Sequence, residues 1–170
     1  MGKAVLISIR PEWCDMIARG EKTLEVRKNR PKLETPFKCY IYRTKGKVKH
    51  IVNGKWVDMP VGGDVIGEFI CDTFVIDKTF GHDPLFNGAA CMSEVECAVY
   101  SCRSPLYGWH ISNLKIYDRP KMITQFKGMC RLKNSCFGCT DWNYQMADCN
   151  GRTITRPPQS WCYVEELASD

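Results

Sequence analysis

The stretch RGEKTLEVRKNRP, residues 19–31, alternates between apolar and polar side chains as a β-strand does. Leu24 and Val26 are two positions apart and would lie on one face of the strand. The opposite face would hold polar and charged side chains, namely Thr23, Glu25, Arg27 and Asn29. The pattern predicts a strand over 22–28, with Lys22 at its entrance. Two interpretations are open for this concentration of charge: a solvated sheet face, or a binding groove.

The residues before this stretch predict how the chain enters it. VLISI, residues 5–9, is an apolar, β-branched run and predicts a mostly buried strand. Pro11 suits the first turn of a helix, and Gly20 suits a helix end, so a short helix is predicted over 11–19. The charged strand would then begin directly where this helix ends.

The rest of the chain predicts strands mixed with few helices. Asn53-Gly54 between two β-prone runs is a strong hairpin signal, and Ser93 with Glu96 fits a helix capping box. Further strands are predicted at 37–44, at 64–78 (one strand or two, with a possible bulge at Gly67), at 107–120 and in QSWCYVEEL. These elements favour an α+β or mixed β-barrel architecture.

Composition narrows the class of protein. The chain has 170 residues, 44% of them hydrophobic, and a net charge of +5. Residues 1–60 carry 14 Lys/Arg against 6 Asp/Glu, whereas residues 61–170 carry 10 against 13. A basic half is the electrostatic signature of a polyanion binder, although it also serves solubility. No apolar run is long enough for a membrane span or a signal peptide, so a cytoplasmic protein without membrane contact is expected.

Three segments together resemble the ASCH domain family of the PUA-like superfamily. They are G-x-K-T-x-E-x-R at 20–27, YGWHISNLKIYDRP at 107–120 and RPPQSWCYV at 156–164. The resemblance spans nearly the whole chain, except a hairpin near 45–57 and a cysteine-rich segment at 130–149. It implies an α+β fold, a PUA-like small β-barrel with two or three short helices and an inserted β-hairpin. We therefore expect a single domain over 1–170 with a cysteine-rich insertion at about 130–150.

The same resemblance implies recognition of RNA or a modified nucleotide. One branch of the family hydrolyses N4-acetylcytidine, and other members are similar to ribonucleases. Lys22 matches the catalytic lysine of that branch, whereas Glu25 stands where the branch has its nucleophilic threonine. If the chain is an enzyme, Lys22 and Glu25 are its catalytic candidates. A protein-interaction module, whose basic half meets an acidic partner, is a third alternative.

The candidate ligand-binding residues combine cations, a carboxylate and aromatic rings. An arginine fork and a lysine suit phosphate, a carboxylate can accept from a base amino group, and aromatic rings can stack on bases. The set is Arg10, Trp13, Lys22, Thr23, Glu25, Arg27, Trp109, His110, Ser160 and Tyr163. The alternative for the charges is a surface ion pair, and the alternative for each aromatic ring is the hydrophobic core.

Eleven cysteines are many for a chain of this length. Cys130, Cys136, Cys139 and Cys149 have the spacing C-x5-C-x2-C-x9-C, which could supply a tetrahedral thiolate site for structural zinc. Unligated thiols and redox or iron–sulfur roles are the alternatives. The remaining cysteines before residue 103 lie among apolar residues and are expected to pack as small hydrophobic side chains, namely Cys14, Cys39, Cys71, Cys91, Cys97 and Cys102.

Overall fold

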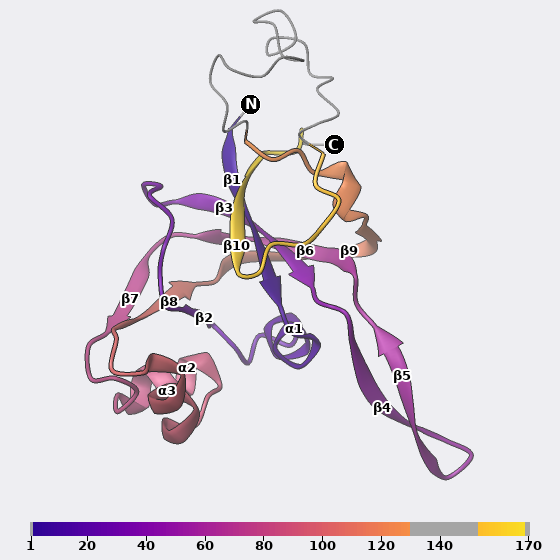
Figure 1. Cartoon of the computed structure of the whole chain (residues 1–170), viewed down its shortest axis with the longest axis horizontal. Coiled ribbons are helices and arrows are strands. Elements are labelled where there is room, and N and C mark those ends of the chain that lie inside the picture. Colours follow the sequence, from indigo (N-terminus) through magenta and orange to yellow (C-terminus); the bar gives the residue numbers. More distant parts are fainter. Residues whose placement is uncertain (1, 130–152, 169–170) are drawn as a thin grey trace, which may run out of the picture.

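The computed structural model describes residues 2–129 and 153–168, which form three β-sheets and three short α-helices (Figure 1). In chain order the elements are β1 (Lys3–Ile9), α1 (Pro11–Ala18), β2 (Leu24–Arg27), β3 (Phe37–Arg43), β4 (Gly46–Val52), β5 (Lys55–Val61), β6 (Asp64–Cys71), β7 (Phe74–Asp77), α2 (Pro84–Ala90), α3 (Glu94–Ser101), β8 (Leu106–His110), β9 (Ser112–Lys121), the 3-10 turn η1 (Ile123–Gln125) and β10 (Trp161–Glu165).

The strands are shared among a five-stranded, a three-stranded and a two-stranded sheet. The strand orders are β10-β1-β3-β6-β9, β2-β8-β7 and β4-β5. Only the β1–β3 pair is parallel among the strand pairs of the described residues, and α1 lies in the connection between these two strands. The α+β class is therefore confirmed, while closure of the sheets into a barrel stays a prediction.

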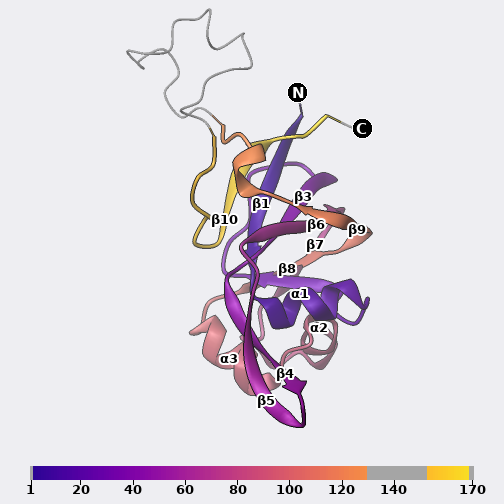
Figure 2. The ribbon, with the colours of Figure 1, turned by 90° about the vertical axis from the view of Figure 1, so that its right-hand side faces the viewer.

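Three apolar clusters separate the layers of the molecule. The first fills the space between the five-stranded sheet, α1 and the three-stranded sheet, and it contains Ile7, Cys14 and Trp109. The second covers the opposite face of the five-stranded sheet around Phe126. The third joins β2 and β8 to α2 and α3 around Phe86. The three-stranded sheet thus lies between the larger sheet and the helices α2 and α3 (Figures 1 and 2).

Local sequence signals are confirmed where they are strongest. Pro11 opens α1, and Gly20 follows it with a φ of +75°, which a glycine adopts without strain. Ser93 and Glu96 form the capping box of α3. Asn53 and Gly54 both have positive φ at the turn of the β4–β5 hairpin, as a two-residue hairpin turn requires.

Several predicted boundaries shift. The charged strand begins at Leu24 rather than 22 and ends at Arg27. Residues 64–78 form two strands, and the register of β6 against β9 shifts next to Gly67. Residues 107–120 also divide, because the chain passes from the three-stranded to the five-stranded sheet after His110. The helix α2 was not predicted, although Asp83 accepts hydrogen bonds from Leu85 and Phe86 as its N-cap.

The expectation for the cysteines is confirmed in four of six positions. Cys14, Cys39, Cys71 and Cys97 are buried, and burial raises the pKa of the Cys71 thiol to about 12. The expectation is wrong for Cys102, which is exposed in a left-handed conformation at the end of α3, and Cys91 is half-buried in the same role after α2. None of the helices within 2–129 and 153–168 has the length and apolar character of a membrane span.

Candidate functional site

The two faces of β2 pack in two different parts of the protein interior. Leu24 and Val26 pack toward α2 in the third cluster, as their shared parity predicts. The opposite face pairs Glu25 with Trp109 and Arg27 with Tyr107 of β8. This face looks toward the five-stranded sheet, because Trp109 and Tyr107 belong to the first cluster. The interpretation of this charged face as a solvated surface is therefore wrong.

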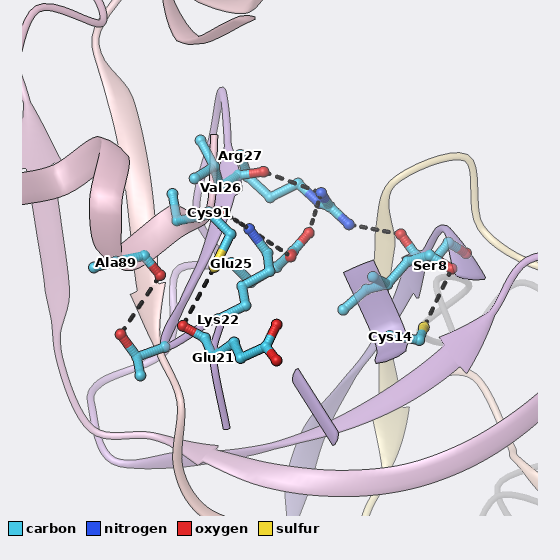
Figure 3. Close-up of polar contacts among 12 residues, drawn as sticks. Ser8, Cys14, Glu21, Lys22, Glu25, Val26, Arg27, Ala89 and Cys91 are labelled. Carbon is cyan, nitrogen blue, oxygen red and sulfur yellow. Dashed lines mark hydrogen bonds and ion pairs between the residues drawn. The ribbon is translucent and has the colours of Figure 1, made fainter. Parts of the chain in front are cut away.

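Glu25 and Arg27 form a buried ion pair between the two sheets. Glu25 is 3% exposed, and its Oε1 lies 2.5 Å from Nη1 of Arg27. The other guanidinium nitrogen, Nη2, donates a hydrogen bond of 2.6 Å to the carbonyl of Ser8 on β1 (Figure 3). The Arg27 side chain therefore bridges the three-stranded and five-stranded sheets. A charge-assisted bridge of this kind fixes the geometry of both groups.

Lys22 adds a second cation from the turn that follows α1. It is 3% exposed, and its Nζ lies 3.8 Å from Oε2 of Glu25 (Figure 3). The same nitrogen donates a hydrogen bond of 2.5 Å to the carbonyl of Ala90. The ammonium also sits 4.8 Å above the centre of the Trp13 ring, a cation–π contact. Burial lowers the pKa of Lys22, and the Glu25 carboxylate opposes part of that shift.

The helix that supplies the Ala90 carbonyl packs closely on the strands. A Cβ at Gly108 would lie 2.9 Å from the Phe86 ring and 3.0 Å from the Leu24 side chain. Glycine at this position therefore lets α2 approach β2 and β8, which brings its last turn over Lys22. The hydrogen bond of 2.9 Å from the Thr23 amide to the Ala89 carbonyl holds the same two segments together.

Polar atoms of this cluster lack hydrogen-bond partners. Glu25 Oε2, Arg27 Nε and Trp109 Nε1 are fully buried and form no hydrogen bond within the described part of the chain. Such atoms are rare in folded proteins, and each costs free energy unless something satisfies it. An acceptor and two donors on one face of β2 and β8 thus offer unused hydrogen-bonding capacity. We call Lys22, Glu25 and Arg27 the charged triad.

A basic hollow of about 480 Å³ opens beside the triad. It is lined by residues 28–34, which follow β2 directly, and by Tyr107, the cross-strand neighbour of Arg27. β10 holds this loop in place, because Trp161 Nε1 donates a hydrogen bond of 2.9 Å to Asn29 and the Lys32 amide donates one of 2.8 Å to the Tyr163 hydroxyl. Three cations face one acid in the lining, namely Lys28, Arg30 and Lys32 against Glu34.

The structure brings several predicted site residues together. An aromatic row continues from Trp109 through Trp161 to Tyr163, with ring centres 5.8 and 5.4 Å apart. Ser160 joins the site through its backbone, since its carbonyl accepts from the amide of Ser8, whose own carbonyl accepts from Arg27. Segments 8, 22–27, 109 and 160–163 therefore meet in one region. The sequence did not indicate Ser8, Asn29 or Ala90, because their roles depend on long-range backbone contacts.

Three other predicted residues lie apart from the triad's interior face. Arg10 is exposed at the N-cap of α1, and Thr23 is exposed, with its hydroxyl 3.5 Å from the Ala89 carbonyl. His110 lies on the face of β8 opposite Trp109, as alternation predicts, and its Nδ1 is 2.6 Å from Asp72. That hydrogen bond lowers the pKa of the Asp72 carboxyl.

The predicted zinc ligands, namely Cys130, Cys136, Cys139 and Cys149, lie outside the described residues. Within 2–129 and 153–168, no group of three or more His, Cys, Asp or Glu side chains could hold a metal ion. The zinc expectation therefore stays a prediction.

Comparison with known families and folds identifies what the chain is similar to. Residues 7–76 match the family model of the ASCH domain, a range that includes the end of β1, the whole of α1 and the whole charged triad. No curated protein matches the sequence.

Solved structures show the same fold at low sequence identity. The crystal structure of ASCH from Zymomonas mobilis has a TM-score of 0.61 at 19% identity, covering 96% of this chain and 88% of that chain. A serine-to-alanine mutant of that protein gives 0.60 at 18% identity, covering 96% and 89%. A tyrosine-to-phenylalanine mutant gives 0.61 at 18% identity, covering 96% and 91%. The resemblance predicted from the sequence is thus confirmed.

Proposed function

Because residues 7–76 match the model of the ASCH domain, we propose that the chain binds RNA or a modified nucleotide at the charged triad and the neighbouring basic hollow. The observation that carries the proposal is a set of buried polar atoms on one face that form no hydrogen bond within the described residues, namely Glu25 Oε2, Arg27 Nε and Trp109 Nε1. A carboxylate oxygen accepts from an exocyclic amino group, and the two N–H groups donate to base or phosphate oxygens. A nucleotide offers both kinds of group on one molecule.

The hollow has the positive charge that would bind the phosphate end of a nucleotide. Lys28, Arg30 and Lys32 give it a surplus of positive charge, which suits phosphate. Tyr107 contributes an aromatic ring next to these cations, and rings beside cations are a common means of holding a base and its phosphate. The proposed division is base recognition at the triad and phosphate binding in the hollow.

The test is calorimetric titration with the common nucleoside monophosphates, with N4-acetylcytidine and with a short single-stranded RNA. Glu25→Gln keeps the size of the side chain and replaces its charge and one acceptor oxygen. We expect this variant to lose at least about tenfold in affinity for ligands with an exocyclic amino group. Glu94→Gln, the same change at an exposed glutamate, is the matched control. Unchanged affinity in a folded Glu25→Gln variant would contradict the proposal.

A hydrolase acting at the same site is a second candidate. Lys22 favours it, because burial lowers the pKa of its ammonium and so increases the fraction of neutral amine. Glu25 replaces the threonine nucleophile expected from the resemblance, so the amine of Lys22 would have to activate water. Mass spectrometry of acylated nucleosides and RNA after incubation tests this. Turnover that Lys22→Met abolishes would support the hydrolase.

For Cys130, Cys136, Cys139 and Cys149 we keep structural zinc as the proposal, on the basis of their spacing. Elemental analysis of protein purified without chelator is the test. About one equivalent of zinc is expected, and less than about a tenth of an equivalent of zinc or iron would end the proposal.

A further inference from the structure

The β4–β5 hairpin is apolar and basic at once, and it stands away from the sheets. Figure 1 shows its two strands extending from the body of the molecule. Every residue from Ile51 to Pro60 is exposed. Residues 45–61 contain four lysines, Lys45, Lys47, Lys49 and Lys55, against the single acid Asp58. Within the described residues, none of these lysines forms an ion pair.

Basic and apolar side chains lie together on one face of the hairpin. We call Lys47, Lys49, Ile51 and Trp56 the strip. Cross-strand partners share a face, and Ile51 is paired with Trp56. Trp56 is 69% exposed and Ile51 is 61% exposed. Because side chains two positions apart also share a face, Lys47 and Lys49 lie along the same side of β4, each about 7 Å from the next such position. Asp58 is the cross-strand partner of Lys49 and lies on this face too, so the face has an aromatic tip and a base with two lysines and one acid.

We propose that this strip binds single-stranded nucleic acid as an arm separate from the charged triad. An exposed indole stacks on any base, and lysines on one side of it contact successive phosphates. Charge complementarity favours a polyanion as the partner of the hairpin. Residues 45–61 as a whole carry a net charge of +3, which would have no counterpart in a purely apolar partner. Such binding is tolerant of sequence, because every base has an aromatic face.

The arm would bind nucleic acids longer than a mononucleotide. The triad fixes its groups by burial and hydrogen bonds, which suits recognition of one nucleotide. The hairpin offers exposed lysines and a ring, which suit contact with the backbone and bases of an extended strand. This inference does not depend on the triad's ligand, and the two sites are separable by ligand length.

The experiment measures binding of a fluorescently labelled oligouridine of about 20 nucleotides by anisotropy at several salt concentrations. Trp56→Ala and the double variant Lys47→Gln/Lys49→Gln test the strip. Leu85→Ala, which removes another exposed apolar side chain, and Lys78→Gln/Lys115→Gln, which removes two other exposed lysines, are the matched controls.

We expect Trp56→Ala to weaken binding about tenfold. The double lysine variant should reduce the slope of log affinity against log salt by roughly 1.4, or about 0.7 for each phosphate that a lysine no longer neutralises. Affinity for mononucleotides should not change in either variant, which distinguishes the arm from the proposed triad site. Equal affinity in wild type, test variants and controls would overturn the inference. A self-association that Trp56→Ala abolishes, with RNA affinity unchanged, would also overturn it and assign the strip to a second copy of the chain.

Discussion

The charged triad and the β4–β5 hairpin use the same residue types in opposite surroundings. The triad holds two cations and a carboxylate between the sheets, with Lys22 and Glu25 each 3% exposed and the Arg27 side chain 13% exposed. The hairpin leaves its lysines, and with them Trp56 at 69% exposure, in solvent. Buried charges must be paired and fixed, so removing one exposes the other to a large desolvation cost. Exposed charges contribute little to stability and remain available to a partner.

Charged residues therefore have two different roles in this protein, and the amino-acid composition alone does not distinguish them. Both segments belong to the basic half of the chain, residues 1–60. Only the fold decides that Lys22 contacts a carbonyl of α2 while Lys47 faces solvent. We expect stability to depend on the first group and salt-sensitive association on the second.

The largest expected contrast is between two tryptophans. Trp109 is fully buried and contacts the rings of Phe37, Phe74 and Trp161, so Trp109→Ala should lower the free energy of unfolding by about 3–5 kcal/mol. Trp56→Ala should change it by less than about 0.5 kcal/mol, because the ring is exposed. Urea denaturation measures both. Similar decreases in the two variants would break the distinction between the regions.

The second contrast compares two arginine–glutamate pairs. Arg27→Met would remove the bridge to Ser8 and leave Glu25 buried with Lys22 as its remaining charged partner, which should cost about 3 kcal/mol. Arg19→Met would break the exposed pair with Glu21, and its unfolding midpoint in urea should stay close to that of the wild type. A stable Arg27→Met variant would show that the buried pair is dispensable for folding.

The smallest expected effect is a pH dependence carried by Lys22. Burial lowers its pKa, so between that lowered value and the ordinary lysine value the unfolded chain binds more protons than the folded chain. Across this window the free energy of unfolding of the wild type should rise with pH relative to Lys22→Met, by at most about 1.4 kcal/mol per pH unit. Urea titrations from neutral to alkaline pH measure the difference, and Lys78→Met supplies the baseline for losing a surface lysine. If the difference in unfolding free energy between the wild type and Lys22→Met did not change with pH, a lowered pKa of Lys22 would be contradicted.

The parts of the fold that the sequence predicts well are those with local signals. Pro11 and Gly20 bound α1, Asn53-Gly54 turns the hairpin, and Ser93 caps α3, because each residue acts within a few positions of itself. The short helix α2 escaped prediction because it has only seven residues and contains Gly88, so its periodicity is weak. Its cap at Asp83-Pro84 was the signal that could have indicated it.

The alternation of side chains in the candidate site was predictable, but the burial of its charged face was not. The alternation of residues 22–27 correctly separates Leu24 and Val26 from Glu25 and Arg27. Whether the charged side faces water depends on what covers it, and the cover comes from β1 and α2. The contact from Lys22 to Ala90 joins residues 68 positions apart. No pattern within one strand carries that information.

The link between Ser8 and the closing segment also bears on how the protein is made. The Ser8 hydroxyl donates to the carbonyl of Pro158, 150 positions later, and β1 pairs with β10. At a synthesis rate of about 5–20 residues per second, β1 would be translated roughly 8 to 30 s before its edge partner. During that interval one edge of β1 has no β10 to pair with, an exposure that favours binding by a chaperone.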